Sequence, residues 1–289
     1  MPGKAQAPET DTRAALGILL LAALCVVAGL TWLLTFNWPP QVACATSQCK
    51  EAREWVSSAV TVLVLLGGLF QYWRAQQWKR AEFVAAEMKA FFSDRDVRKV
   101  VTMIDWTQRH INLFNDINTN PRAWPLVSRQ MQTRALYLHT LAKDVIAFDE
   151  KTSSEAPGSD LAGFTHEQAA IRDAYDAFLD GLERFSSYVT TGLVSVRDLR
   201  PYLKYWMYEI PKKGDDDENE WSCIFFAYVA FYDYTGVQRL FSAFGRDIAF
   251  GSPLFEDFLS TMRDKSLAER LRAELNTKAA SSEMESLAR

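Results

Sequence analysis

Arg134 and His139 are the pair of side chains in this chain whose types and spacing could carry out a reaction. An arginine holds phosphate through its guanidinium group, and a histidine acts as a general acid or base near neutral pH. Together they would suit cleavage of a phosphodiester. A separation of five residues, however, places the two side chains well apart around one helix. The alternative is an arginine on the solvated face of a helix and a histidine at the edge of the core.

A run of acidic residues offers the oxygen ligands that Ca²⁺ and Mg²⁺ prefer: Asp215, Asp216, Asp217, Glu218 and Glu220. The run lacks the glycine turn and the ligand spacing of an EF-hand. The sequence also has no H-E-x-x-H, no paired C-x-x-C and no glycine-rich phosphate loop. We therefore expect no metal site and no cofactor, and we interpret residues 211–220 as a solvated, charged loop.

The four cysteines are too few and too scattered for a disulfide scaffold. Cys44 and Cys49 lie close together in a polar segment, and a disulfide between them would close a small ring in an exported loop. Two unpaired thiols are an equally good interpretation. Cys25 and Cys223 lie in apolar stretches, where we expect them to be packing residues.

Two uncharged apolar runs near the N-terminus predict a pair of membrane helices. The first, Ala14–Phe36, has 23 residues and the second, Val56–Trp73, has 18. At about 1.5 Å per residue, roughly 20 apolar residues span a bilayer. Tryptophan and tyrosine flank the runs, as is typical of a headgroup belt. A cleaved signal peptide is the alternative for the first run, but such peptides have shorter apolar regions.

Lysine and arginine set the predicted orientation. Two occur in the tail of residues 1–13 and four between Arg74 and Lys89, against two in the loop of residues 37–55. The positive-inside rule then places both termini in the cytoplasm and the loop outside. We predict a multi-pass protein of the inner (cytoplasmic) membrane, with membrane helices over residues 14–36 and 56–74.

No glycine or proline interrupts the pattern after Trp73, so the second membrane helix should continue as a stalk to about Phe92. Ser93 is predicted to cap a following helix that ends at Trp106. The stalk and this helix occupy residues 75–106, a cytoplasmic helical domain residues 107–275 and a flexible tail residues 276–289. Because no strand-like alternation recurs, the predicted fold is all-α: a two-helix transmembrane hairpin whose second helix extends into the helical domain.

Helix signals divide the domain of residues 107–275. We predict helices over Ser128–Glu150 and Ser252–Leu275. Thr165 and Gln168 form a capping box that opens a helix ending near Gly192, and Ser195 begins another. Aromatic residues are dense in two segments, and core packing is favoured over a partner-binding surface: Tyr202, Tyr205, Trp206, Tyr208, Trp221, Phe225, Phe226, Tyr228, Phe231, Tyr232 and Tyr234.

The R-x4-H spacing of Arg134 and His139 resembles the short signature of HEPN ribonucleases, which are helical and usually act as dimers. The resemblance implies that both residues would meet the same pair of a partner chain and cleave RNA. Residue 135 is alanine, whereas the signature usually has a polar residue after the arginine. So short a motif often occurs by chance. A nuclease or toxin effector is therefore kept as an alternative function.

Three longer segments resemble the DUF4760-type family of uncharacterised bacterial membrane proteins: QYWRAQQWKRAEFVAAEMKAFF, VRKVVTMIDW and VSVRDLRPYLKYW. The resemblance covers about residues 60–240. It implies an N-terminal hydrophobic anchor and a helical remainder. It brings no activity to this chain, because the family has no established one.

The expected function is that of a non-enzymatic scaffold or signalling protein in the bilayer, with an undefined protein partner. Gly67 and Gly68, with Ala59 earlier on the helix, would permit close helix contact and hence a homo-oligomer. The net charge of −4 argues against a DNA-binding protein. An oligomeric pore that disrupts membranes is a further alternative, although no charge lies in either run to mark an ion path.

Overall fold

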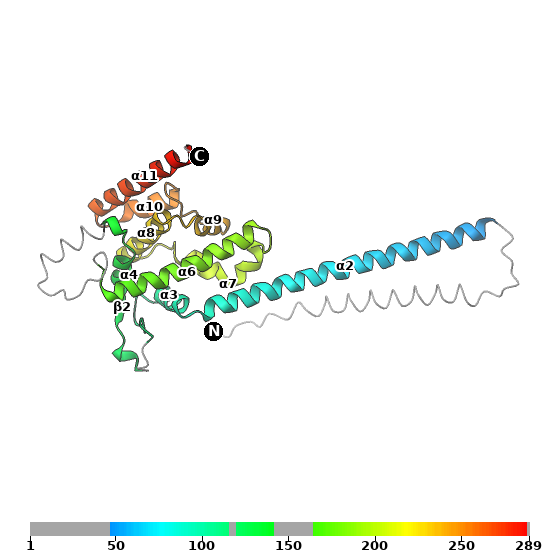
Figure 1. Cartoon of the computed structure of the whole chain (residues 1–289), viewed down its shortest axis with the longest axis horizontal. Coiled ribbons are helices and arrows are strands. Elements are labelled where there is room, and N and C mark those ends of the chain that lie inside the picture. The colour runs from blue at the N-terminus through cyan, green and yellow to red at the C-terminus, as the bar shows by residue number, and fades with distance from the viewer. Residues whose placement is uncertain (1–46, 116–119, 142–163, 288–289) are drawn as a thin grey trace, which may run out of the picture. The chain divides into compact units, whose positions relative to one another are not determined.

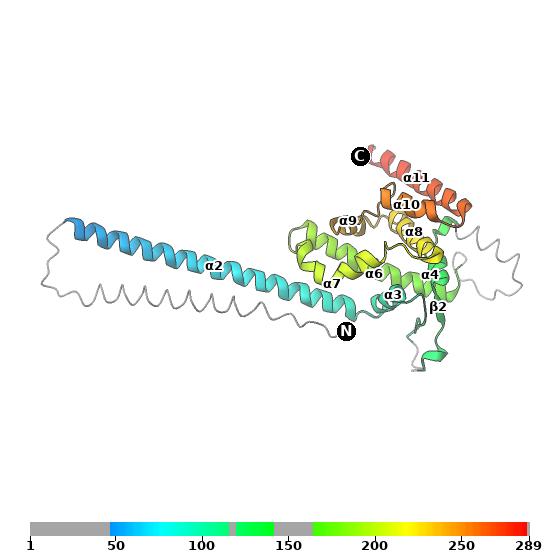
Figure 2. The same ribbon diagram turned by 180° about the vertical axis from the view of Figure 1, so that it is seen from behind.

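The computed structural model describes residues 47–115, 120–141 and 164–287, with side chains described between Trp55 and Met284 apart from residues 56 and 57. The protein is predominantly helical (Figures 1 and 2), which agrees with the predicted all-α class. It divides into two compact units, Met1–Gln77 and Trp78–Arg289. The boundary between them falls inside one long helix.

This long helix, α2, runs from Ser47 to Ser93. Its continuity confirms that the second apolar run extends past Trp73 to about Phe92. The prediction of a loop over residues 37–55 is wrong from Ser47 onward, because no glycine or proline stops the helix there. Within the described residues, Ser58–Ser93 is the one helix long and apolar enough to cross a membrane by length and composition. The predicted membrane helix over residues 14–36 lies outside the described residues.

The unit from Trp78 onward contains the end of α2 and a series of shorter elements. Of these, α6 packs against α3, α4 and α9, and α8 packs against α4, α9, α10 and α11. The elements are α3 (Arg95–Asp105), β1 (Gln108–His110), the 3-10 helix η1 (Pro121–Ala123), β2 (Leu126–Ser128), α4 (Arg129–Ala135), α6 (His166–Thr190), α7 (Val196–Glu209), α8 (Asp216–Phe231), α9 (Thr235–Ala243), α10 (Pro253–Thr261) and α11 (Lys265–Leu287).

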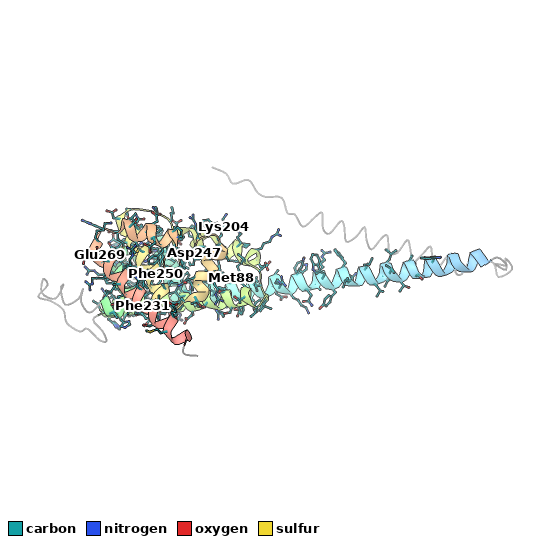
Figure 3. All side chains as sticks on the ribbon, turned by 90° about the horizontal axis from the view of Figure 1, so that it is seen from above. Met88, Lys204, Phe231, Asp247, Phe250 and Glu269 are labelled. Atoms are coloured by element: carbon teal, nitrogen blue, oxygen red, sulfur yellow. The ribbon has the colours of Figure 1, made fainter. Side chains whose placement is uncertain are left out.

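The core of this unit forms around the apolar face of α6, and Figure 3 shows how densely its side chains pack. Every residue of this face is fully buried: Ile171, Tyr175, Phe178, Leu179, Leu182 and Phe185. The last turns of α2 join the same core. The ring of Phe91 lies 5.7 Å from that of Phe178 and 5.2 Å from that of Phe185, measured between centroids.

From Trp221 to Val229, helix α8 is buried on all sides, as its lack of charged residues after Glu220 requires. All residues from Trp221 to Val229 are buried, which confirms core packing for this aromatic segment. The same prediction is wrong for part of α7. Tyr202 and Tyr205 remain 38% and 53% exposed, because they lie on the outer face of that helix.

The predicted helix ends around α6 and α7 are confirmed. Thr165 and Gln168 form both hydrogen bonds of a capping box before α6. Gly192 follows α6 with a φ of +73°, a left-handed conformation that glycine adopts without strain. Ser195 caps α7, accepting a hydrogen bond from the backbone N–H of Asp198.

Strands β1 and β2 contradict the expectation of a wholly helical domain. They pair antiparallel, with Arg109 opposite Val127, and the backbone N–H of Arg129 donates to the carbonyl of Thr107 at 2.8 Å. Each strand has three residues. Such short strands show no alternation that a sequence pattern could reveal.

Other helix boundaries also differ from the predictions. Asp94, not Ser93, caps α3, because the Ser93 hydroxyl donates to the carbonyl of Lys89 within α2. The helix predicted over Ser252–Leu275 is two helices, since Asp264 caps a new start by accepting from the N–H of Leu267. The final helix continues to Leu287, so the predicted flexible tail is helical over most of its length.

Candidate functional site

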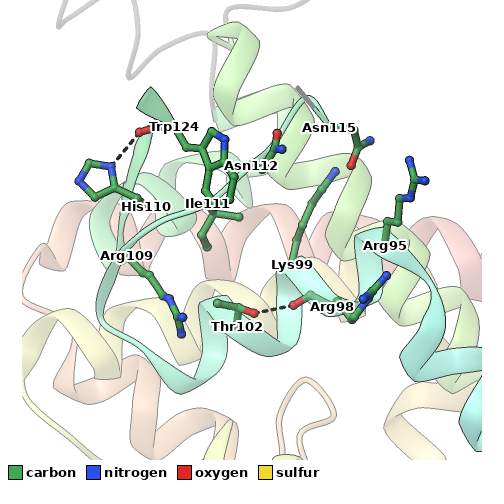
Figure 4. A pocket seen from close by; sticks show the side chains of 10 residues that line it. All are labelled: Arg95, Arg98, Lys99, Thr102, Arg109, His110, Ile111, Asn112, Asn115 and Trp124. Atoms are coloured by element: carbon green, nitrogen blue, oxygen red, sulfur yellow. Dashed lines mark hydrogen bonds between the residues drawn. The ribbon is translucent and has the colours of Figure 1, made fainter. Parts of the chain in front are cut away.

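A basic cavity of about 590 Å³ opens on the surface of the unit from Trp78 onward, between α3 and the segment that follows α3 (Figure 4). Helix α3 supplies Arg95, Arg98, Lys99 and Thr102 to the wall. The opposite wall comes from the start of the β hairpin and the loop after it: Arg109, His110, Ile111, Asn112, Asn115 and Trp124. The lining thus joins cationic groups to amide and aromatic side chains, a composition suited to an anionic ligand.

Helix α3 is held in place by its cap and by its buried face. Asp94 accepts hydrogen bonds from the N–H groups of Asp96 and Val97. The buried side of the helix includes Val97 and Val100. This arrangement leaves Arg95 and Arg98 exposed on the cavity side.

Lys99 has a structural role at the base of the cavity. Its side chain is 9% exposed, and its ammonium group contacts the Asp96 carboxylate at 2.6 Å and the Leu113 carbonyl at 2.7 Å. The bond to Leu113 joins α3 to the loop after β1. Because its charge is paired, Lys99 contributes less to ligand attraction than the exposed arginines do.

His110 and Arg109 are oriented by the hairpin. Nδ1 of His110 lies 2.8 Å from the carbonyl oxygen of Trp124. A carbonyl can only accept, so Nδ1 carries a proton and donates it across the hairpin. The guanidinium group of Arg109 lies 4.9 Å from the centroid of the Trp106 ring, a cation–π contact.

A buried polar network around Arg129 fixes the far end of α3. Arg129 is 4% exposed and donates to the carbonyls of Met103 and Ile104, which end α3. It also donates to Gln132 and pairs with Glu218 at 2.9 Å. Its guanidinium group lies 4.3 Å from the centroid of the Trp221 ring. One side chain therefore links α3 to α4 and α8.

The predicted pair Arg134 and His139 does not lie on one helix. Helix α4 ends at Ala135, and helical structure resumes at His139. The predicted helix over Ser128–Glu150 is therefore wrong at this point. The cause is Arg172 of α6, which donates to the carbonyls of Ala135 and Tyr137 and so replaces the next turn of helix.

Both members of the pair are exposed. Nδ1 of His139 lies 2.9 Å from the hydroxyl of Tyr232, and its ring contacts that of Phe231 edge-on. This placement matches the alternative of a surface arginine and a histidine at the edge of the core. The arrangement gives no support to a catalytic pair within one chain.

The acidic run is the start of α8 and not a loop. Asp215 is the cap, accepting from the N–H of Glu218, and the next acidic residues occupy the first turn. Negative charge is favourable at a helix N-terminus, which explains why the run is helical. The pKa of Glu220 is raised by burial and by the charges of Asp217 and Asp264. Among the described residues, no group of His, Cys, Asp and Glu side chains is placed to hold a metal.

The cysteine predictions are tested at one position. Cys223 is fully buried in α8, and burial raises the pKa of its thiol to about 12, which confirms a packing role. Cys25 and Cys44 lie outside the described residues, as does the side chain of Cys49. The pairing of Cys44 with Cys49 stays a prediction.

The basic cavity was not predicted from the sequence. Arg95 and Arg98 are three residues apart on one helix, which is a visible signal, but nothing in the sequence connects them to Arg109 across the hairpin.

Comparisons of the chain with protein-family models, with curated proteins and with solved structures found no match, so the resemblance to DUF4760-type proteins stays a prediction.

Proposed function

We propose that this chain is a membrane-anchored, non-enzymatic interaction protein of the scaffold or signalling type. In it, α2 crosses the inner membrane and the helical unit from Trp78 onward lies in the cytoplasm. The proposal includes a second membrane helix over residues 14–36, with both termini cytoplasmic. Its partners would be the bilayer, another protein and further copies of the chain.

One observation carries the proposal: between Val62 and Leu66, α2 is apolar around its whole circumference, and nothing in the described chain covers this segment. The consecutive side chains from Val62 to Leu66 are each more than half exposed. At about 100° per residue these five positions face every direction. Burying each such side chain gains roughly 1.5–3 kcal/mol, so a helix of this kind requires a lipid or protein environment.

Cysteine labelling tests the anchor and its orientation together. In a background with the four native cysteines replaced by alanine, Leu65→Cys should resist a membrane-impermeant maleimide in intact and in opened cells. It should react only after detergent solubilisation, because residue 65 would lie within the hydrocarbon. Ser281→Cys, on an exposed part of α11, is the matched control and should react once the cells are opened. Labelling of Leu65→Cys in intact membranes would refute the anchor, and labelling of Ser281→Cys in closed cells would reverse the orientation.

Self-association is proposed to use Gly67 and Gly68. Among the described residues, a side chain added at Gly68 would meet nothing within 4 Å, so packing against that part of the chain does not require a glycine there. Glycine costs about 1 kcal/mol relative to alanine inside a helix. Close approach of another membrane helix is a physical reason to bear that cost.

Replacing Gly67 and Gly68 together by leucine should weaken self-association at least tenfold, because the larger side chains would hold the helix backbones apart. Mass measurement of the chain in lipid nanodiscs over a range of protein-to-lipid ratios would show the change. The control is Leu65→Ile with Leu66→Ile, which keeps the volume and should leave the oligomer intact. Wild-type chain that stays monomeric at every ratio would contradict the proposal.

A further inference from the structure

We propose that the basic cavity between α3 and the β1 hairpin binds a small, soluble, phosphate-bearing molecule of nucleotide size. The inference rests on the proposed function in one respect: the proposed function places the cavity in the cytoplasm. It adds a ligand to a protein for which the proposed function names only membrane and protein partners.

Unpaired positive charge is the first argument. Among the described residues, no carboxylate forms an ion pair with Arg95, Arg98 or Arg109. Arg98 donates one N–H to the backbone carbonyl of Ser93, which leaves its other donors available. Arginine stays charged at any physiological pH, and its planar donors match the oxygens of a phosphate. In a chain with a net charge of −4, this local excess of cations is a specific feature of the cavity.

The positions of the arginines favour a ligand with more than one charge. Arg98 and Arg109 lie on either side of Thr102, and Arg95 lies beyond Arg98 along α3 (Figure 4). The three groups come from α3 and β1, and the bond from Lys99 to the Leu113 carbonyl joins α3 to the loop after β1. A carboxylate carries one charge and would satisfy one arginine, whereas a di- or triphosphate would contact the whole row.

The remaining lining favours a ligand larger than inorganic phosphate. A volume of about 590 Å³ lies within the range of small-molecule sites, roughly 300–1,000 Å³. Trp124 and Ile111 provide apolar and aromatic surface, and Asn112 and Asn115 provide amide groups. Stacking of a base on an aromatic ring contributes about 1–3 kcal/mol. A nucleoside phosphate would use both parts of the lining.

The position of the cavity along the chain favours a soluble ligand over a lipid headgroup. Arg95 follows the end of α2, and the segment of α2 from Trp78 to Ser93 is continuous helix. At about 1.5 Å per residue that segment is roughly 22 Å long. Trp78 itself comes after the apolar run. The cavity residues therefore follow the apolar run by about this length of helix, which favours a soluble ligand.

The test measures binding to the full chain in nanodiscs of phosphatidylcholine, with ATP, pyrophosphate and inorganic phosphate as probes, by calorimetry. We expect saturable binding, tighter for ATP than for inorganic phosphate and weakened by added salt. Arg98→Gln and Arg109→Gln, each alone, should lower the affinity for ATP at least tenfold. The paired control, Arg197→Gln with Arg200→Gln on the exposed side of α7, should leave it unchanged.

The outcomes separate this inference from the proposed function. No saturable binding, or binding that neither cavity variant weakens, would overturn the inference while leaving the membrane anchor intact. A second series uses nanodiscs containing phosphatidylglycerol. Occupation of the cavity by that lipid, seen as loss of ATP binding in wild-type chain, would overturn the preference for a soluble ligand. Because the two variants lie on different elements, a folding defect in one, detected by thermal unfolding, leaves the other as the test.

Discussion

Replacing Arg129 by methionine should lower the free energy of unfolding of the helical unit by about 3–5 kcal/mol. Methionine fills a similar volume but donates no hydrogen bonds. The carbonyl of Ile104 would lose its Arg129 donor, that of Met103 would keep only the donor of the Gln132 amide, and Glu218 would lose its cation. The effect should lie toward the lower end of the range, since Glu218 keeps 27% of its side chain exposed and can be solvated there.

The measurement is urea-induced unfolding of the full chain in detergent, followed by near-ultraviolet circular dichroism. Arg134→Met is the matched control, because it changes the same residue type on the same helix at an exposed position. We expect the control to change stability by less than about 0.5 kcal/mol. If Arg129→Met were equally mild, the buried network would not be a major source of stability.

The same substitution separates support of the cavity from ligand contact. Arg129 does not line the cavity, but it holds the carbonyls at the end of α3, while Asp94 holds its beginning. Loss of the network should therefore increase hydrogen exchange in α3 and at the hairpin, where the N–H of Arg129 meets the carbonyl of Thr107. Hydrogen exchange in α11 should change little, because Arg129 makes no bond to it.

The sequence predicted the fold best where one helix face carries the whole signal. The apolar positions of α6 repeat at helical spacing and its start has a capping box, so local residues were sufficient. The break after α4 could not be predicted in this way, because Arg172, far along the chain, supplies the donors that end the helix. The start of α8 was missed for a related reason. An acidic run is typical of a solvated loop, but it is also favoured at a helix N-terminus.

In the candidate site, too, the sequence shows the features set by neighbouring residues but not those set by residues far along the chain. The charges of Arg95 and Arg98 and their spacing on one helix are evident from the sequence. The cavity exists only because a hairpin with strands of three residues brings Arg109 and His110 opposite them. Conversely, the spacing of Arg134 and His139 suggested chemistry, and the three-dimensional structure places a helix break between them.

The second large effect concerns the contact by which the long helix α2 joins the core. Phe91→Ala should lower the free energy of unfolding by about 3–5 kcal/mol, since the ring is 2% exposed and packs against Phe178 and Phe185. Gly181 of α6 lies directly beneath this ring. A Cβ at Gly181 would lie 2.6 Å from Cδ2 of Phe91, which is well inside van der Waals contact. Gly181→Ala alone should therefore cost about 1–3 kcal/mol through overpacking.

The two changes should not be additive, and this is what identifies the contact. Once the ring of Phe91 is removed, the new methyl group at residue 181 occupies part of the space, and alanine favours the helix by up to about 1 kcal/mol over glycine. Adding Gly181→Ala to Phe91→Ala should then be neutral or stabilising, which a double-mutant cycle in urea would show. Phe92→Ala, at the neighbouring and less buried residue, is the control partner and should leave the cost of Gly181→Ala unchanged. Additive costs for Phe91 and Gly181 would mean that α2 and α6 do not meet at this point, and α2 would then not be part of the core of the helical unit.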